Sequence, residues 1–335
     1  MPALPIVDLR ETSSPADLAS RLMKVGENPG FFYLVGHGIP EELVTGMFNL
    51  SKDFFENCPA ADRARFASNS GEPYKGYSGP AREKLSGLGR GDLKESYHFQ
   101  SFKASPDVEL PLCLDNNRST LRRFSHECER LGNILLQAFS VGLKKPPAFL
   151  PAYHTGQQNR FRLLHYPPYV PGADGPSSPD EEDVRAVAHS DYGSLTLLFQ
   201  EPTDQGGLQV WQNGDWVDVP YITDSIVVNI GDALEFWTAC QLRSTIHRVT
   251  FPPGQAPPQS RFSIPFFVTA DDETVLEPIL PPSNNTTTQD SSKAFFGDIA
   301  RVKGYLSLEP VTALEHRLRR EATIGGSAAV AETTR

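Results

Sequence analysis

Two histidines and one aspartate are spaced so that they could bind one metal ion. His189 and Asp191 are two residues apart, and side chains at such positions point to the same face of an extended strand. His247 follows far enough along the chain for a second strand to return to that face. Two neutral imidazoles and one carboxylate form the donor set that leaves open positions on Fe(II). A lone His-x-Asp pair often occurs by chance, so the case for a metal site depends on the residues that follow His247.

A second pair of polar residues, Arg261 and Ser263, follows the last histidine. They also share one strand face, and arginine can donate two parallel charge-assisted hydrogen bonds to a carboxylate. An anionic co-substrate that chelates the metal with one end and contacts Arg261 with the other would explain the arrangement. The alternative is a surface arginine in a strand salt bridge. Apolar residues flank this segment at 249–251 and 264–268, where an unpaired charge is costly.

Further segments extend this pattern over most of the chain: Leu4–Leu9, Gly30–Ile39, Arg162–Pro168, Asn229–Asp232 and Ser244–Arg248. Together with the two motifs above, they resemble the 2-oxoglutarate- and Fe(II)-dependent dioxygenases of the isopenicillin N synthase-like family. Within that family, the chain looks closest to fungal thymine hydroxylase-like members and related fungal metabolic oxygenases. The segments that carry this finer likeness are Lys75–Ser78, Lys94–Tyr97 and Arg162–Tyr166.

The resemblance implies an Fe(II)- and 2-oxoglutarate-dependent oxygenase. Such an enzyme uses O2 to oxidise, most commonly to hydroxylate, a small organic substrate, and releases succinate and CO2. The ligands that it implies are His189, Asp191 and His247 for the metal, and Arg261, Ser263 and Tyr166 for 2-oxoglutarate. Plant members usually carry Asn two residues before the tyrosine, where this chain has Leu164. One polar contact to the co-substrate is therefore missing or supplied elsewhere.

Four alternatives remain open from the sequence. The same fold could carry an oxidase that does not use 2-oxoglutarate, because Arg-x-Ser can also hold a substrate carboxylate. The same residues could also support desaturation or oxidative ring rearrangement in fungal secondary metabolism. A Zn(II) hydrolase with the same three ligands is the third alternative, and a catalytically silent binding protein is the fourth.

Strand alternation indicates where the substrate could bind. Arg162 shares a strand face with Tyr166, so we expect its guanidinium to point toward the metal and to contact a substrate carbonyl or carboxylate. A bulge in this strand, or pairing of Arg162 with an acidic residue, would reverse this expectation. Other residues expected to contact the substrate are three core aromatics and two residues of the N-terminal half: Phe199, Trp237, Phe267, Tyr77 and Lys94.

Composition and charge narrow the class of protein. The 335 residues, 39% of them hydrophobic, are enough for a sizeable buried core. The net charge of −10 argues against nucleic-acid binding through a general basic face, and the resemblance to the dioxygenases implies a small molecule as the partner. The four cysteines lack Cys-x-x-Cys spacing, which favours a reduced cytoplasmic protein. We find no signal peptide and no apolar run of membrane-spanning length.

The pattern along the chain predicts a mainly β protein with flanking α-helices. Many short strands with intervening turns indicate a double-stranded β-helix, or jelly-roll, core. The clearest strands are expected at 194–200, 207–211, 225–230 and 261–268. Asn213-Gly214 predicts a hairpin turn. Apolar periodicity predicts helices at 17–25, 41–55, 120–141 and 311–320.

These elements suggest three regions along the chain. We expect an N-terminal α/β region with a long supporting helix, then the oxygenase core, then a C-terminal helical segment and tail. Their expected bounds are 1–150, 151–285 and 286–335.

Overall fold

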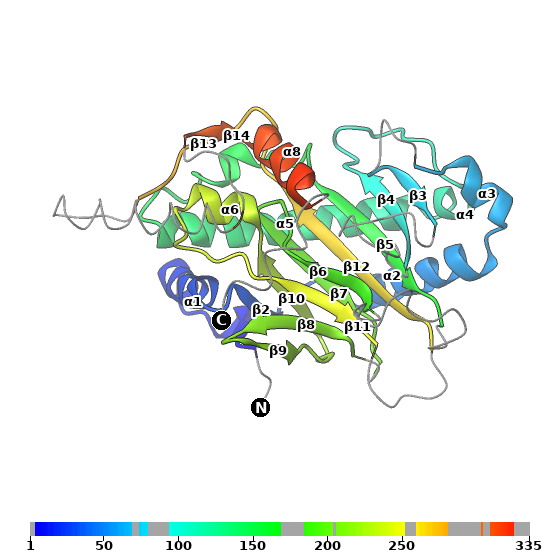
Figure 1. The fold of residues 1–335 in the computed structure, drawn as a ribbon, viewed down its shortest axis with the longest axis horizontal. Coiled ribbons are helices and arrows are strands. Elements are labelled where there is room, and N and C mark those ends of the chain that lie inside the picture. Colours follow the sequence, from blue (N-terminus) through cyan, green and yellow to red (C-terminus); the bar gives the residue numbers. More distant parts are fainter. Residues whose placement is uncertain are drawn as a thin grey trace.

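Two β-sheets face each other at the centre of the molecule, and helices flank them (Figure 1). The computed structural model describes residues 4–68, 74–79, 94–168, 184–203, 206–251, 259–280, 303 and 309–324. Within these residues the larger sheet has eight strands and the smaller sheet has four. This is the jelly-roll core with flanking helices that the strand pattern predicted.

The larger sheet combines strands from both halves of the chain. Its order is β1 (Ile6–Asp8), β2 (Phe31–Val35), β10 (Ser225–Ile230), β7 (Leu195–Gln200), β12 (Arg261–Val268), β5 (Arg160–Tyr166), β4 (Glu95–Gln100) and β3 (Gly76–Ser78). The N-terminal strands thus pair directly with core strands. The division of the chain at residues 150 and 285 stays a prediction.

The smaller sheet is antiparallel and carries the predicted hairpin. Its order is β6 (Val184–His189), β11 (His247–Thr250), β8 (Leu208–Gln212) and β9 (Asp215–Asp218). Asn213 and Gly214 join β8 to β9 with φ angles of 53° and 85°. Positive φ at both central residues defines the tight turn whose twist matches the two strands. A short third sheet pairs β13 (Val275–Leu276) with β14 (Val311–Thr312).

Three helices cover the outer face of the larger sheet, and α5 runs behind the strands in Figure 1. They are α1 (Pro15–Glu27), α2 (Glu41–Lys52) and α5 (Arg118–Gly142). Leu121, Phe124, Cys128 and Leu131 of α5 recur every three or four residues and are all buried, which explains the helical period in the sequence. The expected 41–55 helix ends at residue 52 and continues as a π-helical turn, η2 (Asp53–Asn57).

The remaining helices are short or lie near the ends of the sheets. They are η1 (Leu9–Glu11), α3 (Ala60–Arg65), α4 (Leu112–Asp115), η3 (Pro151–Tyr153), α6 (Asp232–Trp237) and α8 (Ala313–Ile324). The helix α8 is the C-terminal helix expected at 311–320. The rest of the expected C-terminal region, including the tail at 325–335, lies outside the described residues.

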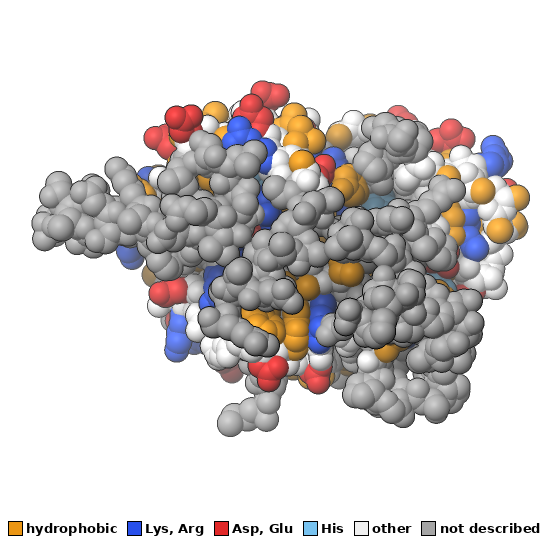
Figure 2. Space-filling model, viewed as in Figure 1, with side chains coloured by type: hydrophobic (Ala, Val, Ile, Leu, Met, Phe, Trp, Pro, Cys, Tyr) orange, Lys and Arg blue, Asp and Glu red, His pale blue; other side chains and the backbone are white. Residues whose placement is uncertain are grey.

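In the view of Figure 2, acidic and basic side chains are interspersed over the described surface, so neither sign of charge dominates it. None of the helices in the described ranges combines the length and the apolar character needed to cross a bilayer.

Candidate active site

The side chains of His189, Asp191 and His247 lie close together at one end of the smaller sheet. His189 ends β6, His247 begins β11, and these two residues pair directly across the antiparallel strands. Their ring centroids are 4.3 Å apart, and His247 Nε2 lies 3.8 Å from Asp191 Oδ1. Each of the three residues offers one ligand atom, and these atoms all lie within 4.8 Å of one another. The arrangement is compact enough to bind one ion.

Neighbouring groups orient all three side chains. Thr196 Oγ1 and Asn229 Nδ2 donate hydrogen bonds to Asp191 Oδ2 over 2.6 and 2.8 Å. The Nδ1 atoms of His189 and His247 face the backbone carbonyls of residues 187 and 245. A proton on each Nδ1 leaves the Nε2 lone pair available, which is the usual way that a protein presents histidine to a metal.

The charge state of these residues suits a divalent cation. Burial and the adjacent His247 lower the pKa of His189 to about 3, so its imidazole is neutral at physiological pH. Burial alone would raise the pKa of Asp191, but the two imidazoles and the hydrogen bonds from Thr196 and Asn229 bring it below its usual value. The neutral imidazole of His189 and the ionised carboxylate of Asp191 therefore face the same point as the His247 ring.

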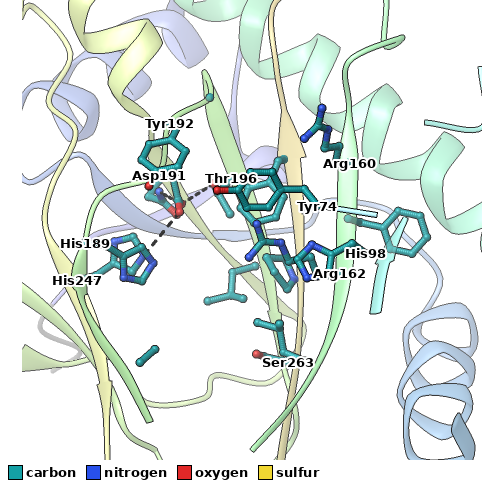
Figure 3. Close-up of a pocket in the computed structure, with 18 of the residues that line it drawn as sticks. Tyr74, His98, Arg160, Arg162, His189, Asp191, Tyr192, Thr196, His247 and Ser263 are labelled. Atoms are coloured by element: carbon teal, nitrogen blue, oxygen red, sulfur yellow. Dashed lines mark hydrogen bonds and ion pairs between the residues drawn. The ribbon is translucent and has the colours of Figure 1, made fainter. Parts of the chain in front are cut away.

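A cavity of about 470 Å³ opens between the two sheets beside this group (Figure 3). It extends from the His-Asp-His group to Arg261, Ser263 and Tyr166. The backbone explains this grouping, because Arg261 pairs with Tyr166 and Ser263 pairs with Leu164 across β12 and β5. Leu164 also lines the cavity, so the position where plant relatives carry Asn presents an apolar side chain here.

Arg261 is a buried cation without a full set of partners. Its side chain is 3% exposed, and its guanidinium carbon lies 5.2 Å from the centroid of the Tyr166 ring. Burial lowers the pKa of Arg261, although Tyr166 and Glu201 act in the opposite direction. Its Nη1 atom is buried and has no hydrogen-bond partner among the described residues. A buried N–H of this kind is costly unless an anion accepts its hydrogen bond.

Arg162 also lines the cavity, as strand alternation predicted. The pairing of β5 with β12 and with β4 keeps one register along the strand, so no bulge reverses the alternation. The Arg162 guanidinium lies over the rings of Phe267 and Tyr74, at 5.2 and 5.6 Å from their centroids. Phe267 and Lys94 line the cavity as well. Figure 3 shows Arg162 on the wall opposite His189, Asp191 and His247.

Three other predicted contacts lie outside the cavity lining. Thr196 and Leu198 of β7 face the cavity, so Phe199 faces the helices and packs on Phe124 of α5, with ring centroids 5.0 Å apart. Trp237 lies on α6 and packs on Tyr153, with ring centroids 5.4 Å apart. These two aromatics fill the core rather than wall the cavity.

Tyr77 is the third of these residues. Its hydroxyl donates a hydrogen bond to Glu95, which also pairs with His165. Its chain neighbours Tyr74 and Ser78 line the cavity instead.

The sequence interpretation missed several residues of the cavity. Alternation puts Arg160 on the strand face of Arg162, but the sequence interpretation gave it no role at the cavity. Arg317 and Glu321 also line the cavity from α8. Their spacing of four residues puts them on one helix face, but nothing in the sequence relates that helix to the metal site. Thr196, which donates a hydrogen bond to Asp191, likewise belongs to no recognisable sequence motif.

Comparisons with known proteins agree with this site. The model of the 2OG-Fe(II) oxygenase superfamily matches residues 157–270, and that of the N-terminal region of non-haem dioxygenases in morphine synthesis matches residues 4–119. A UPF0676 protein of Schizosaccharomyces pombe is 36% identical over 82% of this chain and 84% of its own length. The 2-oxoglutarate-dependent dioxygenase frbA of a Dothideomycetidae species is 34% identical over 70% and 74% of the two chains.

A similar solved structure is that of the thymine-7-hydroxylase of Neurospora crassa in complex with alpha-KG and thymine. It has a TM-score of 0.77 and 27% identity, and the match covers 96% of each chain. The chain therefore belongs to the 2-oxoglutarate- and Fe(II)-dependent oxygenase superfamily. It is a 2-oxoglutarate-dependent dioxygenase that uses Fe(II) and O2, and an oxidase that works without 2-oxoglutarate is not favoured.

Proposed function

We propose that His189, Asp191 and His247 bind Fe(II), and that Arg261, Ser263 and Tyr166 hold the C5 carboxylate of 2-oxoglutarate. The observation that carries this proposal is the buried, incompletely bonded guanidinium of Arg261 in the same cavity as the three donors. A dicarboxylate with a 2-oxo acid at one end would satisfy both sites together. Arg261 would bind the far carboxylate through two charge-assisted hydrogen bonds.

The bound Fe(II) and 2-oxoglutarate supply the oxidising chemistry, in which O2 converts the co-substrate to succinate and CO2 and oxidises the substrate. The residues of the chain hold and shield these reactants. Thr196 and Asn229 keep the Asp191 carboxylate ionised and in one orientation, because both donate hydrogen bonds to it. The apolar walls, including Leu164, Ala186 and Leu208, exclude water from the cavity.

For the substrate, we propose a small planar molecule that carries carbonyl or carboxylate groups. Arg162 would donate hydrogen bonds to such a group, and Phe267 would stack on the ring. Lys94 lines the same cavity and adds positive charge near the substrate. The similarity to the Neurospora crassa thymine-7-hydroxylase, which is known in complex with thymine and with 5-formyluracil, supports this class.

We further propose a cytoplasmic location and a role in secondary metabolism. All four cysteines are free, which agrees with a reducing compartment. A relative from Penicillium crustosum, the 2-oxoglutarate-dependent dioxygenase traH, is 28% identical over 82% of this chain. A fluorescent fusion would test the location, and metabolite profiles of a deletion strain would test the role.

The substitution Arg261→Lys tests the co-substrate site. Lysine keeps the charge but loses the two-pronged donor, so the KM for 2-oxoglutarate should rise about tenfold or more, while the KM for the substrate changes little. The control is Arg248→Lys on β11, because Arg248 lies outside the cavity lining and stacks on Trp216. A rise in the substrate KM alone would assign Arg261 to the substrate and contradict the proposal.

A further inference from the structure

A second buried arginine, Arg185 on β6, lies close to the proposed co-substrate site. Its side chain is 2% exposed, which makes it one of the largest fully buried side chains in the described structure. Its Nη2 atom donates a hydrogen bond to the carbonyl oxygen of Gln259 over 3.0 Å. Its Nε and Nη1 atoms are buried and have no hydrogen-bond partner within the described ranges. Two N–H donors of a buried cation are therefore available.

Arg185 and Arg261 converge on one aromatic ring from opposite sheets. Their guanidinium carbons lie 6.0 and 5.2 Å from the centroid of the Tyr166 ring. Arg185 comes from the smaller sheet and Arg261 from the larger sheet. Arg185 is not itself among the residues that line the cavity, but its neighbour Ala186 is, and the pairing of β6 with β11 shifts register between Ala186 and Val184. The two cations thus lie at the same end of the space between the sheets.

The electrostatics of this pair are unfavourable without an anion. Burial, followed by repulsion from Arg261, lowers the pKa of Arg185 to about 10, so the Arg185 side chain is still charged at neutral pH. Among the described residues, the carboxylate of Glu201 acts on the pKa of Arg261, and none acts on that of Arg185. The Glu201 carboxylate already binds Lys52 Nζ over 2.7 Å and the backbone N–H of Phe262 over 3.1 Å. Buried like charges with unpaired donors destabilise a protein unless an anion binds between them.

We propose that Arg185 is a second guanidinium for the C5 carboxylate of 2-oxoglutarate, and that it supplies the polar contact that Leu164 does not. This inference rests on the proposed role of Arg261 at the same carboxylate. A carboxylate has two oxygens with about four acceptor positions, which is enough for donors from two arginines together with Ser263 and Tyr166. The second arginine would make the site selective for 2-oxo dicarboxylates over 2-oxo monocarboxylates.

A purely structural role for Arg185 is the competing explanation. Its guanidinium carbon lies 4.9 Å from the centroid of the Phe251 ring, and its hydrogen bond to Gln259 joins β6 to the segment just before β12. If these contacts were its whole purpose, its loss would weaken the fold and would affect all ligands equally. The two roles therefore predict different results with two ligands.

The experiment compares 2-oxoglutarate with 2-oxopentanoate, which has the same 2-oxo acid and chain length but no second carboxylate. Anaerobic titration calorimetry on protein loaded with Mn(II) measures binding without turnover. We expect Arg185→Met to weaken 2-oxoglutarate binding at least tenfold and 2-oxopentanoate binding less than twofold. Without ligand, its Tm should equal or exceed that of the wild type, because the substitution removes an unpaired buried charge.

The variants distinguish failure of this inference from failure of the proposed function. Arg185→Lys restores the charge, so it should recover part of the affinity, and it replaces Arg185→Met should that variant fail to fold. Equal weakening of both ligands, or unchanged 2-oxoglutarate affinity in both Arg185 variants, would overturn the inference. Unchanged 2-oxoglutarate affinity in Arg261→Lys would instead overturn the proposed function on which the inference rests. The Arg248→Lys protein is the matched control for both positions.

Discussion

At the residue scale, positions fixed by strand alternation were the most predictable. His189, Asp191 and Arg162 all line the cavity, as their spacing indicated. β5 keeps one register along its length, whereas β6 ends at His189 and Asp191 lies just beyond it. Phe199 shows the limit of reasoning from residue type. Its neighbours Thr196 and Leu198 define the cavity face of β7, but the sequence does not reveal which face of β7 that is. Arg185 carried no signal, because its importance comes from a neighbour on the other sheet.

The substitution Arg162→Ala tests the substrate side of the cavity. It should raise the KM for the substrate and partly uncouple the reaction, because a substrate without its hydrogen bonds is poorly positioned for oxidation. More succinate should then form per molecule of product, and binding of 2-oxoglutarate should change little. Succinate and product are both measured by chromatography. Full coupling with an unchanged substrate KM would remove Arg162 from the substrate site.

At the element scale, the C-terminal helix α8 shows what local pattern cannot reveal. Its helical character was predictable from the sequence, but its contacts are long-range. Arg320 Nε donates a hydrogen bond to Asp232 Oδ2 over 2.8 Å, and the backbone N–H of Asp232 donates to the carbonyl oxygen of Asp191. The helix that contributes Arg317 and Glu321 to the cavity is therefore linked to the proposed metal site.

The packing of α8 predicts a pH-dependent stability. His316 is 3% exposed and packs on Phe236 of α6, and burial lowers its pKa from 6.5 to about 4. Below pH 6.5 the unfolded chain binds a proton that the folded chain does not, so stability falls until about pH 4. This residue alone should cost about 2 kcal/mol at pH 5 relative to pH 8.

Comparison with His316→Leu isolates this contribution. The variant should lose less stability between pH 8 and pH 5 than the wild type, as measured by urea unfolding at each pH. His154, whose pKa burial also lowers to about 4, titrates in both proteins and cancels in the comparison. Identical pH slopes for the two proteins would show that His316 does not contribute.

At the scale of the whole molecule, the shared eight-stranded sheet predicts one cooperative unit. Strands β1 to β4 of the N-terminal half pair with β10 and β5 of the core, so neither half has a complete sheet alone. The sequence indicated the types of these elements, but the pairing of distant strands follows from the packing of both halves. Far-UV circular dichroism, to which α5 contributes strongly, and fluorescence of the three tryptophans, all in the later half, should give one coincident unfolding curve.

Two separated transitions would contradict this expectation and would support independent folding of residues 1–150. A truncated chain that begins at residue 151 offers a second test. It should fail to fold, because β5 and β10 would lose their partners β4 and β2.

The iron content of purified variants tests the central claim most directly. Each of His189→Ala, Asp191→Ala and His247→Ala should lose Fe(II) in anaerobic equilibrium dialysis, whereas the wild type should bind one Fe(II) per chain. The matched control is His98→Ala, because His98 lines the same cavity outside the proposed metal group. It should bind iron like the wild type. Iron content equal to the wild type in the three triad variants, or its loss only in His98→Ala, would contradict the account.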